Sequence, residues 1–373
     1  MVLVAGWMGE ARLLPRLDRF GNLWGLPPVS GPFVTSGSHV DTVPNGGRLD
    51  GALGTVMALE AVERLDGPFG VLVCAGEEAP RFGAGTLGSR QLAGKLSAED
   101  LAEMTDADGV SALEARSEFQ DLLQGIPLLE EPDPLGRVAA HVEVHIEQRR
   151  GLKERGAAVG VATAVAGPAR YRMVFTGSTG HTGETQVGRR RDALCAAAEA
   201  VLICERLSRE AASAGKSVVA TVGTVGVEPN SLTAIPGRVE LGLDVRVTDA
   251  DERDALVFRL AREAAGAAEG RGVAFEVRKG SAADPTVMDG RMVEVVEAVG
   301  RTAGIPVVRC VSRAGHDAQH VAARTPAALL FVASSNGVSH APEEAVDDAD
   351  LEPALALLSA LLPELENIGG GRP

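Results

Sequence analysis

The chain has 373 residues, of which 45% are hydrophobic and 23% charged, and its formal net charge at pH 7 is -15. This length and composition predict a globular protein of about two domains. Because so acidic a chain repels phosphate backbones and anionic lipid, we expect no nucleic-acid partner and no membrane partner.

The N-terminal third alternates short apolar runs with amphipathic helical stretches, which is typical of α/β layering. The predicted elements are strands at 32–38 and 69–76, a helix at 51–65 and short acidic helices within 97–124. The segment HVEVHIEQ, at 141–148, alternates with period two. It therefore predicts a strand with His141, Glu143, His145 and Glu147 on one face.

The order of predicted strands and helices changes in the middle of the chain. From about 156 to 280 the pattern predicts strand, strand, helix, strand, strand, helix, strand, which forms a small α+β sandwich. After 285 the first pattern resumes, with predicted helices at 290–302 and 351–366 and strands at 306–311 and 327–333. We therefore expect an α/β domain made of 1–155 and 281–373, with a second domain, 156–280, inserted in it.

Candidate metal ligands follow several of the predicted strands. His39, the pair Glu77 and Glu78, His145 and His340 each come at or after a strand end, and open α/β sheets form their sites at the carboxyl ends of strands. A lone histidine is more often a hydrogen-bonding residue than a ligand, but four such strand ends favour a metal site. Imidazole and carboxylate ligands without thiolate suit zinc or manganese in an open catalytic site.

The loop GSHVDTVPNGGRLDG, residues 37–51, adds two carboxylates. Asp41 lies two residues after His39, so in an extended segment it can face the same way and orient the imidazole ring. Asp50 could bridge two ions. Glu77 and Glu78 point to opposite sides of an extended chain, so one could bind metal while the other acts as a base. An exposed acidic turn is the alternative interpretation of that pair.

The cysteines give an expectation about the compartment. Cys74, Cys195, Cys204 and Cys310 form no CxxC pair, which favours reduced, buried thiols. Neither a signal peptide nor an apolar run of membrane-spanning length is visible. We therefore expect a cytoplasmic protein.

Several long motifs carry a family resemblance. They are GSHVDTVPNGGRLDG, EEAPRFG, HIEQ, PNSLTAIPGRVELGLDVR, AGHDA and GVSHAPEE. In this order and spacing the chain resembles the M20-type amidohydrolases over nearly its whole length. The match is to the branch that holds N-carbamoyl-L-amino acid hydrolase, β-ureidopropionase and allantoate amidohydrolase. The resemblance implies a two-metal catalytic domain with a mixed sheet flanked by helices, an inserted lid domain that dimerises, and hence a homodimer.

The resemblance also implies a ligand set for two divalent ions per subunit. His39 and His145 would hold one ion, Glu78 and His340 the other, and Asp50 would bridge them. Zinc or manganese is expected, with cobalt or nickel as further candidates.

Catalytic and substrate roles follow from the same resemblance. Glu77 would be the general base and acid, and Asp41 would orient a metal ligand. His181 of the lid would reach the active site of the other subunit and stabilise the oxyanion. Gln148 would contact the substrate, and Arg246 would pair with its carboxylate, because the planar guanidinium meets a carboxylate with two bonds.

Some positions depart from the family pattern and affect the substrate pocket. Asn230 is present in the PN motif, but Thr233 stands where a second asparagine is usual, and it offers fewer hydrogen-bonding groups. Arg313 replaces a usual glycine and would add a second cation, and Arg149 replaces the glycine after HIEQ. We therefore expect intact hydrolytic machinery with altered substrate contacts.

The remaining histidines receive structural interpretations. His141 matches no ligand position, His316 and Asp317 of the AGHDA motif are expected to support the site from behind, and His320 is expected at the surface.

The sequence leads to one main hypothesis and two alternatives. The main one is a metal-dependent hydrolase of a linear amide or ureido carbon–nitrogen bond in a small carboxylated molecule, of the N-carbamoyl-L-amino acid hydrolase or allantoate amidohydrolase type. The nearest alternative is an M20 dipeptidase or N-acyl amino acid hydrolase. The third is a non-catalytic dimeric metal-binding protein, suggested by Thr233 and Arg313.

Overall fold

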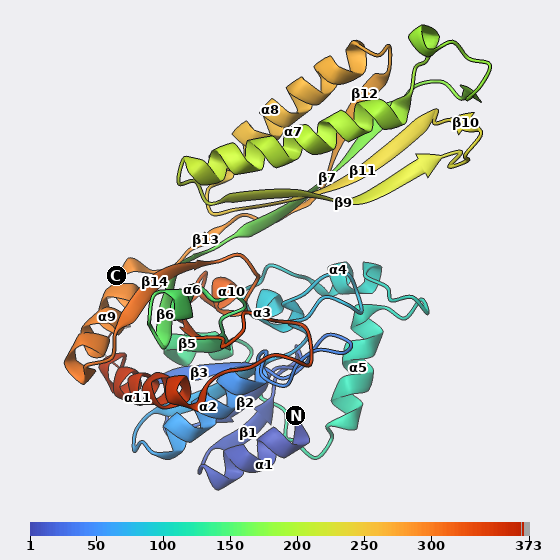
Figure 1. The fold of residues 1–373 in the computed structure, drawn as a ribbon. Coiled ribbons are helices and arrows are strands. Elements are labelled where there is room, and N and C mark those ends of the chain that lie inside the picture. Colours follow the sequence, from blue (N-terminus) through green and yellow to red (C-terminus); the bar gives the residue numbers. More distant parts are fainter. Residues whose placement is uncertain (367, 369–373) are drawn as a thin grey trace. The chain divides into compact units, whose positions relative to one another are not determined.

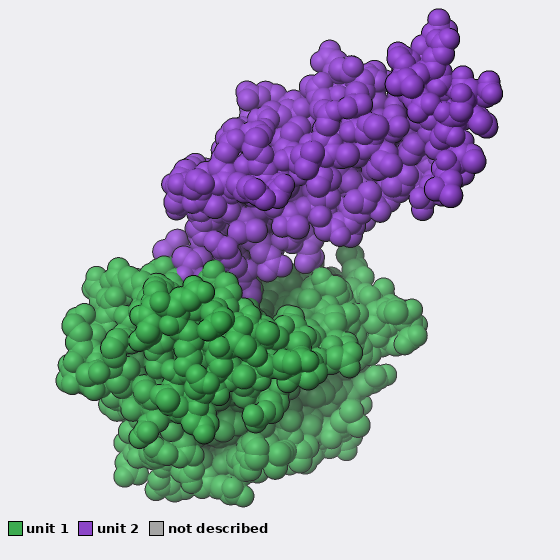
Figure 2. All heavy atoms as spheres, viewed as in Figure 1, with its two compact units in different colours: residues 1–163, 288–310, 315–373 green, residues 164–287, 311–314 purple. Residues whose placement is uncertain are grey.

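The computed structural model describes residues 1–366 and 368, and the chain divides into two compact units (Figure 2). The first unit contains Met1–Thr163, Met288–Cys310 and the chain from Gly315 onward. The second contains Ala164–Val287 and Val311–Ala314. Among the described residues, no helix has the length and apolar character needed to cross a membrane.

The first unit is an α/β layer structure (Figure 1). Its strands are β1 (Leu14–Leu17), β2 (Leu23–Leu26), β3 (Phe33–His39), β4 (Phe69–Cys74), β5 (Val138–Ile146), β15 (Ala327–Val332) and the larger parts of β6 (Val159–Val165) and β14 (Val307–Ser312). Its helices are α1 (Val2–Glu10), α2 (Ala52–Glu63), α3 (Leu87–Leu92), α4 (Ala98–Glu103), α5 (Ala112–Leu122), α6 (Gly151–Glu154), α9 (Gly290–Ala303), α10 (Ala318–Val321), α11 (Asp348–Glu364) and a 3₁₀ turn at Pro134–Arg137.

The sheet of the first unit is mixed, as the family resemblance implies. Along its path the strands follow the order β1-β2-β4-β3-β5-β15-β6. The four central strands β4, β3, β5 and β15 are parallel, whereas β1, β2 and β6 pair antiparallel. Strands β3, β4 and β15 are buried along their whole length. In β4 and β15 this burial appears in the sequence as a continuous apolar run, whereas β3 also buries Thr35, Ser36 and Ser38. The parallel pairing brings four carboxyl ends to one edge of the sheet.

Helices cover the central strands. Helix α2 packs against β3, β4 and β5, and α11 packs against both α2 and α9. Helices α3 and α10 pack together, with α10 against β5 and β15. The core contains mainly Ala, Val and Leu, with buried Met8, Met57 and Phe69, as expected from an aromatic content of 3%.

The second unit is the predicted α+β sandwich. Its four-stranded sheet, within the described residues, has the order β12-β7-β11-β9. Helices α7 and α8 lie side by side on one face of it (Figure 1). Its elements are β7 (Gly167–Thr176), β8 (Gly180–His181), α7 (Ala193–Ser213), β9 (Val218–Glu228), β10 (Ala234–Ile235), β11 (Arg238–Val247), α8 (Ala250–Glu269), β12 (Ala274–Ala282), β13 (Thr286–Val287) and a 3₁₀ turn at Val187–Arg189.

Small side chains explain the close packing in this unit. Ala193, Ala196, Ala197 and Ala200 form the buried face of α7, at the three- and four-residue spacing of an amphipathic helix. The side chain of Asp192 caps this helix by accepting hydrogen bonds from the N–H groups of its first turns.

Two features differ from the expectation. Strand β6, placed by the sequence in the inserted domain, pairs with β15, so residues up to Thr163 lie in the first unit. The two-residue strands β8 and β10 pair into a short ribbon that is too brief for a periodic signal. That the second unit acts as a lid and dimerisation domain stays a prediction.

Gly54 lies in close contact with the sheet. A Cβ atom built on Gly54 would lie 1.8 Å from the carbonyl oxygen of Val144, in β5. Since backbone atoms cannot move aside cheaply in a packed core, only glycine fits here.

We expect Gly54→Ala to lower the free energy of unfolding by about 1–3 kcal/mol through overpacking. Gly6→Ala is the matched control, because Gly6 lies in α1 with no atom within 4 Å of a built Cβ, and alanine there should stabilise the helix slightly. Urea unfolding of both variants measures the difference. Equal stability of the two variants would contradict the tight contact.

Candidate active site

Side chains with metal-binding atoms meet at the carboxyl edge of the central strands. His39 ends β3, His145 lies one residue before the end of β5, and Glu77 and Glu78 follow β4. His340 lies on the loop after β15. The parallel register of these strands therefore brings together residues that are far apart in the sequence.

Asp50 lies at the centre of this group, and its two carboxylate oxygens face different partners. Oδ1 lies 3.0 Å from Nε2 of His145 and 3.5 Å from Nε2 of His39. Oδ2 lies 3.5 Å from Nε2 of His340, whose Nε2 is in turn 3.3 Å from Oε1 of Glu78. The structure thus brings all five predicted ligands into two sets that share Asp50; their role as ligands stays a prediction.

Backbone carbonyls orient both strand-end histidines. Nδ1 of His39 lies 3.0 Å from the carbonyl oxygen of Asp41, and Nδ1 of His145 lies 2.9 Å from that of Ile146. Because a carbonyl oxygen only accepts, Nδ1 carries the proton in each neutral ring. Each Nε2 then presents its lone pair toward Asp50, as a metal ligand must.

Asp41 orients the site differently from the expectation. Its carboxylate Oδ1 is 3.8 Å from Nδ1 of His39, beyond hydrogen-bond distance, and the backbone carbonyl makes the contact instead. Oδ2 accepts the N–H of Glu78 at 3.0 Å. The carboxylate of Asp41 therefore fixes the turn that carries Glu77 and Glu78. Sequence spacing alone does not reveal that its partner is a backbone N–H group.

Gly51 shapes the loop that carries Asp50. It has φ +66°, and a Cβ there would lie 2.4 Å from the ring of His39. Glycine adopts this conformation at no steric cost. The chain can therefore turn from Asp50 into α2 while passing directly over the imidazole.

The histidines and Asp50 shift one another's pKa values. Burial alone would lower the pKa of His39, but contact with Asp50 and the charges of Glu77 and Asp41 raise it well above its usual value. Burial likewise opposes protonation of His145, and Asp50 raises its pKa. Burial would raise the pKa of Asp50, yet both histidines hold it below its usual range.

Glu77 has the surroundings of a general base. Its Oε2 lies 3.8 Å from Nε2 of His39. Burial raises the pKa of Glu77 well above its usual value; His39 opposes this shift, and Asp317 and Glu143 add to it. A carboxylate with a raised pKa can take and return a proton near neutral pH. Burial also raises the pKa of Glu78, against the effect of His340.

A second layer of buried polar groups lies behind the ligands. The ring of His316 packs edge-on against His145, with centroids 4.6 Å apart. Glu143 accepts the N–H of Ala318 at 2.6 Å, and Asp317 accepts the hydroxyl of Ser89 at 2.5 Å. Burial raises the pKa of Asp317 to about 7. Sequence reasoning gave Glu143 no role, although its place on the same strand face as His145 is the signal that points to it.

The other histidines divide into one expected and one unexpected case. His141 is buried beside Thr35, 2.9 Å from its hydroxyl, and burial lowers the pKa of the ring to about 4. The prediction that His320 lies at the surface is wrong. The residue is buried, and its Nε2 lies 2.9 Å from the hydroxyl oxygen of Thr86. Its place on α10, which packs against α3, explains the burial.

The donor set around Asp50 fits divalent metal ions. It consists of imidazole nitrogens and carboxylate oxygens, with no thiolate, which suits zinc or manganese. Nε2 of His39 and Nε2 of His145 face each other at 3.4 Å. Two neutral imidazoles with their lone pairs so close need a cation or a shared proton between them.

His181 lies in the ribbon of the second unit and is exposed. Its Nδ1 accepts the N–H groups of Gly183 and Glu184, at 3.0 and 3.3 Å. The neutral ring must therefore carry its proton on Nε2. This tautomer leaves an N–H donor on the exposed ring.

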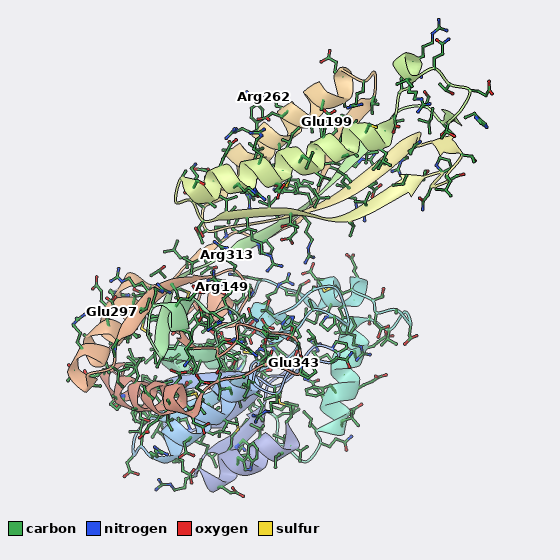
Figure 3. The ribbon with its side chains drawn as sticks, viewed as in Figure 1. Arg149, Glu199, Arg262, Glu297, Arg313 and Glu343 are labelled. Carbon is green, nitrogen blue, oxygen red and sulfur yellow. The ribbon has the colours of Figure 1, made fainter. Side chains whose placement is uncertain are left out.

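The other predicted substrate residues have defined surroundings in their own units. Arg246 is fixed by Oδ1 of Asp244 at 3.0 Å and by the carbonyl oxygen of Arg313 at 2.8 Å. Arg313 is labelled in Figure 3. In the first unit, the side-chain amide of Gln148 donates to Oδ2 of Asp50 at 3.2 Å, which places it beside the candidate ligands.

The loop of the second unit that carries Asn230 and Thr233 is exposed. Asn230 has φ +49°, a conformation that asparagine tolerates better than most residues. The carbonyl oxygen of Thr233 accepts the N–H of Thr182, next to His181. The ribbon thus places His181 and Thr233 near each other.

Comparisons with known proteins agree with this architecture. The profile of peptidase family M20/M25/M40 matches residues 36–364. The N-carbamoyl-L-amino acid amidohydrolase of Geobacillus stearothermophilus is 35% identical over 92% of this chain and 84% of that protein. The allantoate amidohydrolase of Escherichia coli is 32% identical over 96% of this chain and 88% of that protein. The crystal structure of a hydantoinase/carbamoylase family amidase from Burkholderia ambifaria has TM-score 0.86 and 29% identity, over 98% of this chain and 88% of that one.

Because Asp50 raises the pKa of His39 and His145, metal binding should release protons. A ligand nitrogen must be deprotonated, so apparent metal affinity should rise with pH until both folded-state pKa values are passed. Titration calorimetry with Zn²⁺ in buffers of different ionisation enthalpy measures the protons released. We expect release at pH 7, less release from His39→Asn, and unchanged release from His181→Ala. Proton-free binding at pH 7 would contradict the electrostatic account.

Proposed function

This chain is a member of peptidase family M20/M25/M40, and from that premise we propose that it is a metal-dependent hydrolase of linear carbon–nitrogen bonds in small ureido or amide compounds that carry a carboxylate. The observation that carries the proposal is the Asp50 carboxylate, whose two oxygens face two sets of imidazole and carboxylate donors. The names of the similar proteins, N-carbamoyl-L-amino acid amidohydrolase and allantoate amidohydrolase, support this substrate class.

We assign the metal ligands by position. His39, His145 and Oδ1 of Asp50 would hold one divalent ion, and Glu78, His340 and Oδ2 of Asp50 the other. Bound divalent ions supply a Lewis acid and lower the pKa of water. Gln148, which donates to Asp50, would contact the substrate at the rim of this cluster.

The residues of the chain provide the proton transfers. Glu77 takes a proton from the attacking water and returns it to the leaving nitrogen. The Nε2–H group of His181, set by the two backbone donors at Nδ1, donates to the developing oxyanion. With a carbamoyl substrate, one water is consumed, and the products are the amino acid, carbon dioxide and ammonia.

Substrate selection would lie with the second unit. Arg246, held in place by Asp244 and Arg313, offers a planar fork for a carboxylate. Asn230 and Thr233 supply polar contacts, with Thr233 as the residue that shifts preference. We propose that the chain works as a cytoplasmic homodimer in which His181 of the partner subunit completes each site.

The experiment that tests this function is a product assay on the metal-free protein reloaded with Mn²⁺, Zn²⁺ or Co²⁺. The panel contains N-carbamoyl-L-amino acids, allantoate, N-acyl amino acids and dipeptides. We expect metal-dependent ammonia release from at least one ureido compound. Cleavage of acyl or peptide substrates alone would identify a dipeptidase or acylase instead. Turnover of none of them, with metal bound, would support the non-catalytic alternative.

We expect Glu77→Gln to reduce kcat by about 10²–10⁴-fold while metal content stays unchanged, because the amide cannot shuttle a proton. Steady-state kinetics and metal analysis of the purified variant measure both quantities. Glu103→Gln, an exposed carboxylate on α4, serves as the control and should keep wild-type rates. Wild-type turnover by Glu77→Gln would refute the role of Glu77.

A further inference from the structure

The buried carboxylate of Glu344 connects the two loops that carry Asp50 and His340. It belongs to the GVSHAPEE motif, but no role follows for it from the sequence. Only 5% of its surface is exposed, and an unsatisfied carboxylate would be costly at such a position. The hydrogen bonds of the Glu344 carboxylate show which groups stabilise its charge.

Each oxygen of Glu344 serves a different loop. Oε2 accepts the backbone N–H groups of Leu49 and Asp50, both at 3.3 Å. Oε1 accepts the backbone N–H of His340 at 2.9 Å and lies 3.4 Å from the hydroxyl oxygen of Ser339. Glu344 therefore fixes the backbone of Asp50, the candidate ligand shared by both sets, and that of His340, a candidate ligand of the second set.

Ser339 closes the connection. Its hydroxyl oxygen lies 3.0 Å from Oδ2 of Asp50 as well as 3.4 Å from Oε1 of Glu344. The contacts thus run from Glu344 to Oδ2, the oxygen of Asp50 that faces His340 and not the one that faces His145.

Gly47 makes room for this arrangement. A Cβ atom on Gly47 would lie 2.0 Å from Oε2 of Glu344 and 2.7 Å from the carbonyl oxygen of Ala341. The loop therefore approaches the carboxylate as closely as a glycine backbone allows.

The two candidate ion pockets differ in how their histidines are supported. His39 and His145 lie at the ends of buried parallel strands, so the sheet itself holds them. His340 lies on a loop, its side chain is 47% exposed, and its φ is +59°, a conformation that is unfavourable outside glycine. Its backbone N–H bond to Glu344 holds it in that conformation.

We infer that Glu344 is a positioning residue that sets the pocket of Asp50 Oδ2, Glu78 and His340, while the pocket of His39 and His145 forms without it. This inference rests on the proposed two-ion site. The amide of a Glu344→Gln variant keeps the size of the side chain but offers a single acceptor oxygen. Its NH₂ group would face either the N–H of His340 or those of Leu49 and Asp50.

The test is a metal titration of the metal-free protein with Mn²⁺ and, separately, Co²⁺, which resolves the first and second binding steps. In Glu344→Gln we expect the affinity of one step to fall about 10–100-fold and that of the other to stay within about twofold. The absorption spectrum of the Co²⁺ protein reports each step independently of activity. The control is Glu343→Gln, whose exposed neighbouring carboxylate (Figure 3) should leave both steps unchanged.

Gly47→Ala is a second variant that leaves Glu344 itself intact. Displacement of the carboxylate by the new Cβ should weaken the same step. Urea unfolding of each metal-free variant distinguishes a loss of folding from the loss of one metal site. Only a folded variant can still bind the first ion.

The outcomes separate the inference from the function. A wild-type protein that binds a single ion would overturn the two-ion site and the inference with it. If the wild type binds two ions and Glu344→Gln and Gly47→Ala weaken both steps equally or neither, the inference alone is overturned. Selective loss of one step in both variants supports it.

Discussion

The carboxylate of Asp50 is the interaction on which the candidate site depends. Its oxygens face opposite ways, one toward His39 and His145 and the other toward His340. A carboxylate used in this way contributes one oxygen to each of the two candidate ion pockets. The rest of the first unit holds this one group in place: Gly51 allows the turn over His39, α2 begins directly behind it, and Glu344 fixes its backbone.

Burial explains why these groups are tuned to one another. His39, His145, Glu143 and Asp317 are all nearly inaccessible, so each charge depends on its neighbours and not on water. Burial alone would favour neutral forms throughout. The contacts between Asp50 and the histidines oppose this, whereas Glu77, beside other carboxylates, keeps a raised pKa. The same surroundings that favour a cation between the histidines also give Glu77 the proton affinity of a base.

Sequence patterns predicted the fold class because the hydrophobic pattern is a local signal, and strands such as β4 and β15 could be recognised from their apolar runs. The grouping of His39, Glu78, His145 and His340 was predictable because parallel strands bring their ends to one edge. The ribbon of β8 and β10 was missed because two residues carry no period. The backbone role of Asp41, the burial of His320 and the four contacts of Glu344 depend on loop conformation, which sequence patterns do not determine.

The most direct test of the two-ion site is anomalous diffraction from crystals grown with Mn²⁺ or Zn²⁺. We expect two ion peaks in the first unit of each chain, one on each side of Asp50, with His39 and His145 at one and Glu78 and His340 at the other. A single peak, or two peaks of which neither touches Asp50, would contradict it.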